Sequence, residues 1–428
     1  MRLLQFTAGA GAMYCGSCLH SNTLALHLAA LGVDVTLVPL YTPTRTDEKN
    51  VSTGQVFFGG VSVFLEQSLP FLRRTPKIFD ALWDSNAALY AVGLLNTSTD
   101  PASLGPLTVS MLRGEAGHQK KEIGHLSAWL DTQQRFEVAL IPYTLLLGLA
   151  PALRARGLRV ACELQGEDLF LDGLIEPWKT EAKQLIALRA RDVDLFIAGS
   201  RYYADMMSAA LGIPRDKIRI VPHGIDIDER LMTLKSVHAE EFTVGFFARI
   251  APEKGLHVLA EAYVRFRERQ PPRKARLVAG GYLAGEHRPY LLGITDRLRV
   301  AGREGEFHYY GSPDRQGKFE FLRSLDLLAA PTPYPEPKGL FAMEAMACGV
   351  PVVLPRHGAF PELIEATQGG VLHTAGDEAG LVEALERLAG DHDTRTAMGQ
   401  QGARAVRELL AAPLMAARTR DLLAGLLD

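Results

Sequence analysis

The chain contains 428 residues, of which 47% are hydrophobic and 22% charged, and its formal net charge at pH 7 is −3. This length exceeds that of one compact α/β domain and predicts two domains with substantial cores. The near-neutral charge gives no reason to expect nucleic acid as a partner, and no apolar run approaches the ~20 residues of a membrane span.

In the first half, short apolar runs alternate with helical patterns, which is typical of βαβ units around a parallel sheet. A glycine-rich turn over residues 9–16 leads to a predicted helix that carries Leu24, Leu28 and Leu31 on one face. Residues from about 42 to 135 interrupt this order, and such an insertion is expected to carry its own elements or a binding role. The predicted strands cover residues 3–6, 33–38, 138–141, 158–163 and 194–199.

A second series of the same kind follows residue 223. Its predicted strands cover residues 242–247, 276–279, 306–310, 325–330 and 351–354. Its predicted helices begin near Gly255, Gly317, Gly339 and Asp377, and a last helical stretch covers residues 413–427. The sequence therefore predicts a first domain over residues 1–222, a second over 223–412 and a terminal helix over 413–428.

Residues 334–353 carry two glutamates, Glu336 and Glu344, eight positions apart. The pattern predicts a short helix from Gly339 to about Cys348, with Gly349 at its end. Glu336 would lie in the loop before this helix, and Glu344 about one and a half turns inside it. The backbone N–H groups at the helix start, from Gly339, Leu340 and Phe341, would form a site for an anion.

Residues 245–256 contain a second group of polar residues, which follows a predicted strand. Arg249 and Lys254 lie in the expected loop, and Gly255 precedes the next helix. A guanidinium and an ammonium at the carboxyl end of a parallel strand suit a diphosphate, because arginine binds two oxygens and lysine acts as a point charge.

Together these segments resemble the E-x7-E and Arg–Lys motifs of the retaining, nucleotide-sugar-dependent glycosyltransferases of family 4, also called glycosyl transferases group 1. The resemblance extends to about residue 390 and is strong only between Val221 and Glu365. It implies the GT-B fold, in which two Rossmann-like α/β domains face each other across a cleft. It also implies an acceptor-side first domain, a donor-binding second domain and a terminal helix that packs back on the first.

The resemblance further implies that a sugar leaves a nucleotide diphosphate donor with retained anomeric configuration. Arg249 and Lys254 would bind the donor pyrophosphate, and Glu344 would accept hydrogen bonds from the ribose hydroxyls. Glu336 would be the catalytic residue near the anomeric carbon, either as nucleophile or as electrostatic support. Lys338 stands where relatives usually have Phe, which favours an anionic sugar or acceptor as a hypothesis.

In the first domain, the resemblance places Gly9, Gly11 and Gly16 in a loop near the donor phosphates and the acceptor. This loop includes Cys15 and Cys18, whose C-x-x-C spacing is also typical of thioredoxin-like enzymes. We favour a tight loop over redox or metal use, because no second C-x-x-C pair exists to complete a zinc site.

Residues 165–168, which follow a predicted strand, match the place of a family His-Gly segment and its acidic residue. Gln165 can hydrogen-bond a sugar hydroxyl on the acceptor side but cannot titrate. Any acid–base chemistry there would therefore fall to Glu167 or Asp168.

The resemblance implies a UDP- or GDP-sugar as co-substrate and no separate cofactor. We predict no essential metal, since the short Asp-x-Asp matches at residues 192–194 and 226–228 are expected by chance. The sequence does not decide whether the acceptor is a sugar, a lipid-linked molecule or another small molecule. It also leaves open whether the protein contacts a membrane peripherally. Alternatives are an epimerase or hydrolase of the same fold, a non-catalytic nucleotide-sugar-binding protein and, more distantly, a thiol-disulfide enzyme.

Two features bear on cellular location. The N-terminal residues lack the long apolar core of a signal peptide and are typical of a first strand. Four cysteines in a chain of this length argue against a disulfide framework. We therefore expect a cytoplasmic protein.

Overall fold

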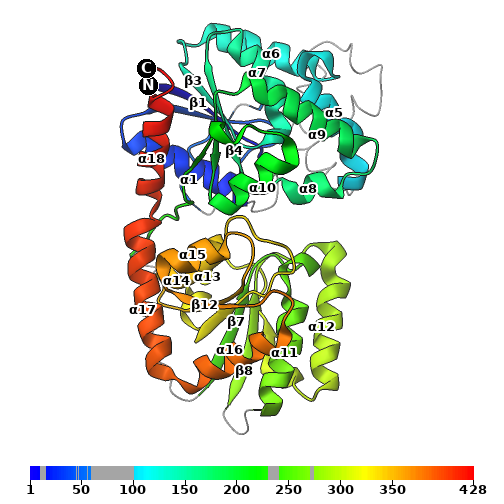
Figure 1. The fold of residues 1–428 in the computed structure, drawn as a ribbon, viewed down its shortest axis with the longest axis vertical. Helices are drawn as coiled ribbons and strands as arrows, with labels where there is room; N and C mark the ends of the chain where they lie inside the picture. Colours follow the sequence, from blue (N-terminus) through cyan, green and yellow to red (C-terminus); the bar gives the residue numbers. More distant parts are fainter. Residues whose placement is uncertain are drawn as a thin grey trace. The chain divides into compact units, whose positions relative to one another are not determined.

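The computed structural model describes residues 1–9, 16–44, 46, 48–54, 56–58, 101–229, 241–269 and 274–428. These residues form two compact units, Met1–Pro222 together with Met415–Asp428, and His223–Leu414. Each unit contains a six-stranded parallel sheet covered by helices (Figure 1). Each also has its own hydrophobic core. The predicted fold class, two Rossmann-like α/β domains, is confirmed.

The first sheet has the strand order β2-β1-β3-β4-β5-β6. Its strands are β1 Arg2–Thr7, β2 Asp34–Pro39, β3 Val138–Ile141, β4 Arg159–Leu164, β5 Leu195–Ala198 and β6 Ile218–Ile220. The central strand β3 is buried along its whole length, as expected for a parallel strand with helices on both faces. The α-helices are α1 Gly16–Ala30, α5 Pro101–Arg113, α6 Lys120–Thr132, α7 Ala150–Arg154, α8 Asp168–Gly173, α9 Trp178–Arg189 and α10 Arg201–Leu211.

One detail of the predicted first helix is wrong. Leu24 and Leu28 are buried as expected, but α1 ends at Ala30 and Leu31 is 36% exposed. Gly32 causes this ending, because its positive φ of 81° closes the helix with a hydrogen bond from its N–H to the Ala29 carbonyl.

The described part of the insertion forms helices that pack on the first unit. Helix α5 runs beside α9, and a Cβ at Gly105 would come within 2.6 Å of the Trp178 side chain. The absence of a side chain at this position therefore permits the close approach of the two helices. Residues 59–100 of the insertion lie outside the described residues.

The second sheet has the order β12-β11-β10-β7-β8-β9. Its strands are β7 Phe242–Phe247, β8 Ala275–Gly280, β9 Phe307–Tyr309, β10 Leu327–Ala329, β11 Val352–Pro355 and β12 Gly370–His373. Its α-helices are α11 Leu256–Arg269, α12 Arg288–Val300, α13 Arg315–Arg323, α14 Leu340–Ala347, α15 Phe360–Thr367, α16 Glu378–Gly390 and α17 His392–Leu409. The last helix, α18, covers Ala412–Ala424.

The segments that enter and leave the second unit are hydrogen-bonded to each other. The N–H of Ile225 donates to the Leu410 carbonyl, and the N–H of Ala412 donates to the Ile225 carbonyl. A Cβ at Gly224 would lie 2.9 Å from backbone atoms of Ala411 and Ala412, so a glycine suits this approach. Among the described residues, no helix combines the length and apolar character needed to cross a membrane.

Candidate active site

The two glutamates of residues 334–353 lie where the sequence predicts. Glu336 is in the loop after β10, and Glu344 is in the second turn of α14. Gly339 precedes this helix with a φ of 70°, a conformation that glycine adopts without strain. Both glutamates are buried, with only 7% and 9% of their surface exposed. Charged side chains are rarely this buried unless they are paired, so their partners are informative.

Glu336 is paired with Lys254. The lysine Nζ lies 2.5 Å from Oε2 of Glu336, and the backbone N–H of Lys338 lies 3.4 Å from Oε1. Burial by itself raises the pKa of Glu336, but the ammonium groups of Lys254 and Lys338 oppose this and bring the pKa below its ordinary value. Glu336 is therefore an ionised carboxylate at neutral pH.

The backbone of Glu336 is held by the turn after β11. The N–H of Ala359 donates to the Glu336 carbonyl at 2.8 Å. Gly358 has a φ of 61°, and a Cβ there would lie 2.5 Å from the carbonyl oxygen of Glu336. This turn therefore supports the loop that carries Glu336 and also starts helix α15.

Arg249 and Lys254 follow β7 as predicted, and they have different environments. Lys254 is largely buried beside Glu336 and lies 5.7 Å from the centre of the Tyr334 ring. Arg249 is about half exposed and pairs with Glu253. Gly255, with a φ of 81°, lets this loop lie against the loop after β10. A Cβ at this position would lie only 2.2 Å from the Pro331 carbonyl oxygen, so a larger residue would push the two loops apart. β7 and β10 are neighbours in the sheet, so their carboxyl ends share one edge.

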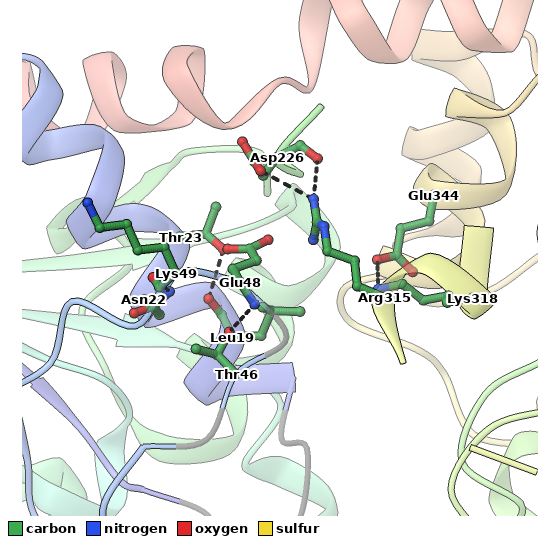
Figure 2. Close-up of polar contacts among 10 residues, drawn as sticks. All are labelled: Leu19, Asn22, Thr23, Thr46, Glu48, Lys49, Asp226, Arg315, Lys318 and Glu344. Atoms are coloured by element: carbon green, nitrogen blue, oxygen red, sulfur yellow. Dashed lines mark hydrogen bonds and ion pairs between the residues drawn. The ribbon is translucent and has the colours of Figure 1, made fainter. Parts of the chain in front are cut away.

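Glu344 is paired with Lys318 of α13, a residue that sequence reasoning missed. The Nζ of Lys318 lies 2.7 Å from Oε1 of Glu344, and Lys318 is only 7% exposed (Figure 2). One turn earlier, Arg315 binds both the carbonyl and the carboxylate of Asp226, at 3.3 and 3.2 Å. This contact accounts for one aspartate of the Asp-x-Asp match at residues 226–228.

In the first unit, the structure describes only part of the predicted glycine-rich loop. Gly9 has a φ of 78°, and a Cβ there would overlap the Thr42 carbonyl oxygen. Gly16 is the first residue of α1, and Cys18 is buried in that helix. Gly11 and Cys15 lie outside the described residues.

Figure 2 also shows how the segment after β2 is attached to α1. Thr23 of α1 donates from its hydroxyl to Oε2 of Glu48 at 2.7 Å, and the Thr46 hydroxyl accepts from the Glu48 N–H. Asn22 donates to the Lys49 carbonyl at 3.0 Å. This end of the predicted insertion is thus anchored to the first helix of the unit.

Gln165 and Glu167 belong to a buried polar network at the carboxyl end of β4. Gln165 donates to Glu163 at 2.9 Å, and Oε2 of Glu167 accepts from the Gln165 N–H at 2.8 Å. Glu163 also lies 2.7 Å from Nε2 of His20, which sequence reasoning did not identify. Both Gln165 and Glu167 are over nine-tenths buried, so in this conformation their partners are protein groups.

The Glu167 carboxylate also contacts Thr144, whose N–H and hydroxyl each lie 3.0 Å from Oε1. Burial raises the pKa of Glu167 above its ordinary value, and the hydrogen bonds from Thr144 and Gln165 offset only part of this effect. Among the residues that the structure describes, no group of three or more His, Cys, Asp or Glu side chains could hold a metal ion.

Comparison with known families identifies the chain. The family model described as glycosyl transferases group 1 matches residues 233–405, and that described as glycosyltransferase family 4 matches residues 107–229. The chain belongs to the group 1 glycosyltransferases. A relative described as D-inositol 3-phosphate glycosyltransferase, from Nocardia farcinica, is 30% identical over 319 residues, which cover 70% of this chain and 66% of the relative.

The matched region covers between 46% and 66% of the length of the first curated relatives. Solved structures agree on the fold. Sucrose-phosphate synthase from Thermosynechococcus elongatus has a TM-score of 0.71 at 16% identity and covers 100% of this chain and 99% of its own. Anabaena HepE in complex with UDP has a TM-score of 0.69 at 16% identity, with coverage of 99% and 100%. The GT-B fold is thereby confirmed.

Proposed function

We propose that the protein transfers a sugar from a nucleotide diphosphate-sugar to an acceptor hydroxyl with retained anomeric configuration. The observation that carries this proposal is the buried Lys254–Glu336 pair beside the start of α14. It brings a cation, an ionised carboxylate and a helix N-terminus to one edge of the second sheet. These are the groups that departure of a phosphorylated leaving group from a sugar requires.

In the proposed reaction, the bond between the anomeric carbon and the diphosphate oxygen breaks while the acceptor oxygen bonds to the same carbon. Negative charge grows on the departing diphosphate, where Lys254, Arg249 and the N–H groups at Gly339, Leu340 and Phe341 would stabilise it. Positive charge grows at the anomeric carbon, and the ionised Glu336 would stabilise it. If Glu336 instead forms a bond to this carbon, the acceptor oxygen displaces Glu336 from the carbon in a second step. The acceptor proton would pass to the leaving phosphate oxygen or to solvent.

The remaining assignments are also proposals. Glu344 would accept hydrogen bonds from the donor ribose, and Gln165 and Glu167 would act on the acceptor side. Because one similar structure contains UDP and another UDP-glucose, a UDP-sugar is the first donor to test, with GDP-sugars next. The proposal also includes a reaction without a separate cofactor or an essential metal, and a cytoplasmic location.

The acceptor is proposed to be a small phosphorylated polyol or sugar. Curated relatives are described as D-inositol 3-phosphate glycosyltransferase and mannosylfructose-phosphate synthase, and both names refer to a phosphorylated compound. In this chain, Lys338 is a half-buried cation whose ammonium acts on Glu336, and it could complement an anionic substrate group.

The test is product analysis with labelled donors. Purified protein is incubated with a panel of UDP- and GDP-sugars, with inositol 3-phosphate or unphosphorylated inositol as acceptor. We expect a glycoside that retains the donor anomeric configuration by NMR, formed faster with the phosphorylated acceptor. Free sugar or an epimer formed without acceptor would instead indicate a hydrolase or epimerase. Donor binding without any turnover would indicate a sensor.

A further inference from the structure

The pair formed by Lys318 and Glu344 lies within an apolar layer of the second unit. On α14, the residues around Glu344 are buried and apolar, namely Ala342, Met343, Ala345, Met346 and Ala347. On α13, Lys318 is followed by Phe319, which is fully buried. The ammonium and the carboxylate, 2.7 Å apart, therefore form a buried ion pair between α13 and α14.

Stability alone is a weak reason for such a pair. Removing two charges from water costs several kcal/mol per ion, and replacing a buried ion pair with apolar side chains is often neutral or stabilising. The charge on Glu344 is therefore better explained by a ligand that needs it. An apolar residue at position 344 would fit its neighbours but could not accept a hydrogen bond.

Lys318 is held in place by its own helix. Its Nζ lies 5.1 Å from the centre of the Phe319 ring, and the Arg315 guanidinium lies 5.4 Å from the same ring. Arg315 is in turn fixed to Asp226. Helix α13 also has an N-terminal cap, since Asp314 accepts from the Gly317 N–H at 2.8 Å. The Lys318 ammonium therefore contacts Glu344 from a helix whose own position is fixed by these contacts.

We infer that Lys318 is a positioning residue that pairs with Glu344 and orients its carboxylate, and thereby sets how strongly the site prefers ribonucleotides over nucleotides without ribose hydroxyls. This inference rests on the proposed function, in which Glu344 binds the donor ribose. Lys318 acts through Glu344 and does not itself contact the sugar or the phosphates. A carboxylate oriented in this way disfavours an analogue that cannot donate hydrogen bonds, because the oxygen that would accept from the ribose then lacks that donor.

The test compares UDP with 2′,3′-dideoxy-UDP by calorimetry, using wild type, Lys318→Met, Lys318→Arg and Lys274→Met. Lys274 is an exposed lysine of the same unit, so its variant controls for the loss of one charge. We expect Lys318→Met to weaken UDP binding about tenfold, the size of one charge-assisted hydrogen bond, and to leave dideoxy-UDP binding nearly unchanged. Lys318→Arg should restore most of the preference, and Lys274→Met should match wild type.

The inference is overturned if Lys318→Met weakens both ligands equally or keeps the wild-type preference, or if wild type binds the two ligands equally. Should Met at this position prevent folding, Lys318→Gln replaces it, because glutamine is polar but lacks the ammonium that pairs with Glu344, and the same loss of preference is expected. A wild-type protein that binds neither UDP nor GDP would instead contradict the proposed function.

Discussion

Lys254 and Glu336 lie 82 positions apart in the sequence and form a largely buried ion pair, with 2.5 Å between Nζ and Oε2. The pair joins the loop after β7 to the loop after β10. The lysine proposed to bind the donor phosphates is therefore the counterion of the carboxylate proposed to act at the anomeric carbon. A diphosphate in this site would offer Lys254 a second anionic partner. Donor binding would thereby weaken the hold of Lys254 on the Glu336 side chain.

Replacing Glu336 by Gln separates catalysis from donor binding. The variant keeps the shape of the side chain but removes the negative charge, and it leaves Lys254 available for phosphate. We expect the donor Kd to stay the same or fall, while transfer slows by about 100-fold or more. Calorimetry with the donor and a product assay measure the two effects. Glu304→Gln, at an exposed position of the same unit, is the matched control. Equal transfer rates in wild type and Glu336→Gln would contradict the assigned role.

Replacing Lys254 by Ala should mainly weaken donor binding. The variant removes a charge-assisted contact to the diphosphate, so we expect the donor Kd to rise about 10- to 100-fold. It also leaves Glu336 buried without its main counterion, which should lower the melting temperature. Lys274→Ala, which removes an exposed lysine, should change neither quantity. Unchanged donor affinity in Lys254→Ala would rule out phosphate binding by this residue.

The ion pair also predicts a pH dependence of stability. The pKa of Glu336 is lower in the folded protein than its ordinary value. Its contribution is therefore present above the unfolded-state pKa of about 4.3 and is lost as the pH falls through the folded-state pKa. We expect wild type to melt higher than Glu336→Gln near pH 7, and this difference to shrink below about pH 4. Thermal unfolding between pH 3.5 and 7.5 tests this, and a constant difference would argue against the pair.

The turn after β11 offers a test of positioning. Gly358→Ala and Gly376→Ala both place a side chain at a positive φ, 61° and 76°, so both should lose about 1 kcal/mol of stability. Only the Cβ at position 358 meets other atoms, 2.5 Å from the Glu336 carbonyl oxygen, whereas none lies within 4 Å at position 376. We expect transfer to fall only in Gly358→Ala. A similar fall in both variants would show that backbone strain, not displacement of Glu336, is responsible.

The sequence predicted the central strands well, and the reason is burial. β3 and β7 coincide with the predicted ranges, because strands buried on both faces read as continuous apolar runs. β6 and β12, Ile218–Ile220 and Gly370–His373, were not predicted. Both are short edge strands with partly exposed residues, so their apolar pattern is weak. Helix α14 was predicted within a residue at each end, since glycines mark both of its limits.

At the candidate site, the sequence located each motif but not its partners. The proximity of Lys254 to Glu336 follows from β7 and β10 sharing a sheet edge, a neighbour relation that the sequence does not contain. Lys318 was missed, because a lysine on an amphipathic helix is normally exposed and nothing in the local pattern distinguishes a buried one. The same holds for His20, which reaches Glu163 across 143 positions.

The most direct test of the central claim is a crystal structure of the protein with a bound UDP- or GDP-sugar. We predict that the diphosphate lies within about 3 Å of Nζ of Lys254 and of the N–H groups at the start of α14, with the anomeric carbon next to Glu336. A diphosphate bound away from Lys254 and Gly339 would contradict the proposed site and the mechanism derived from it.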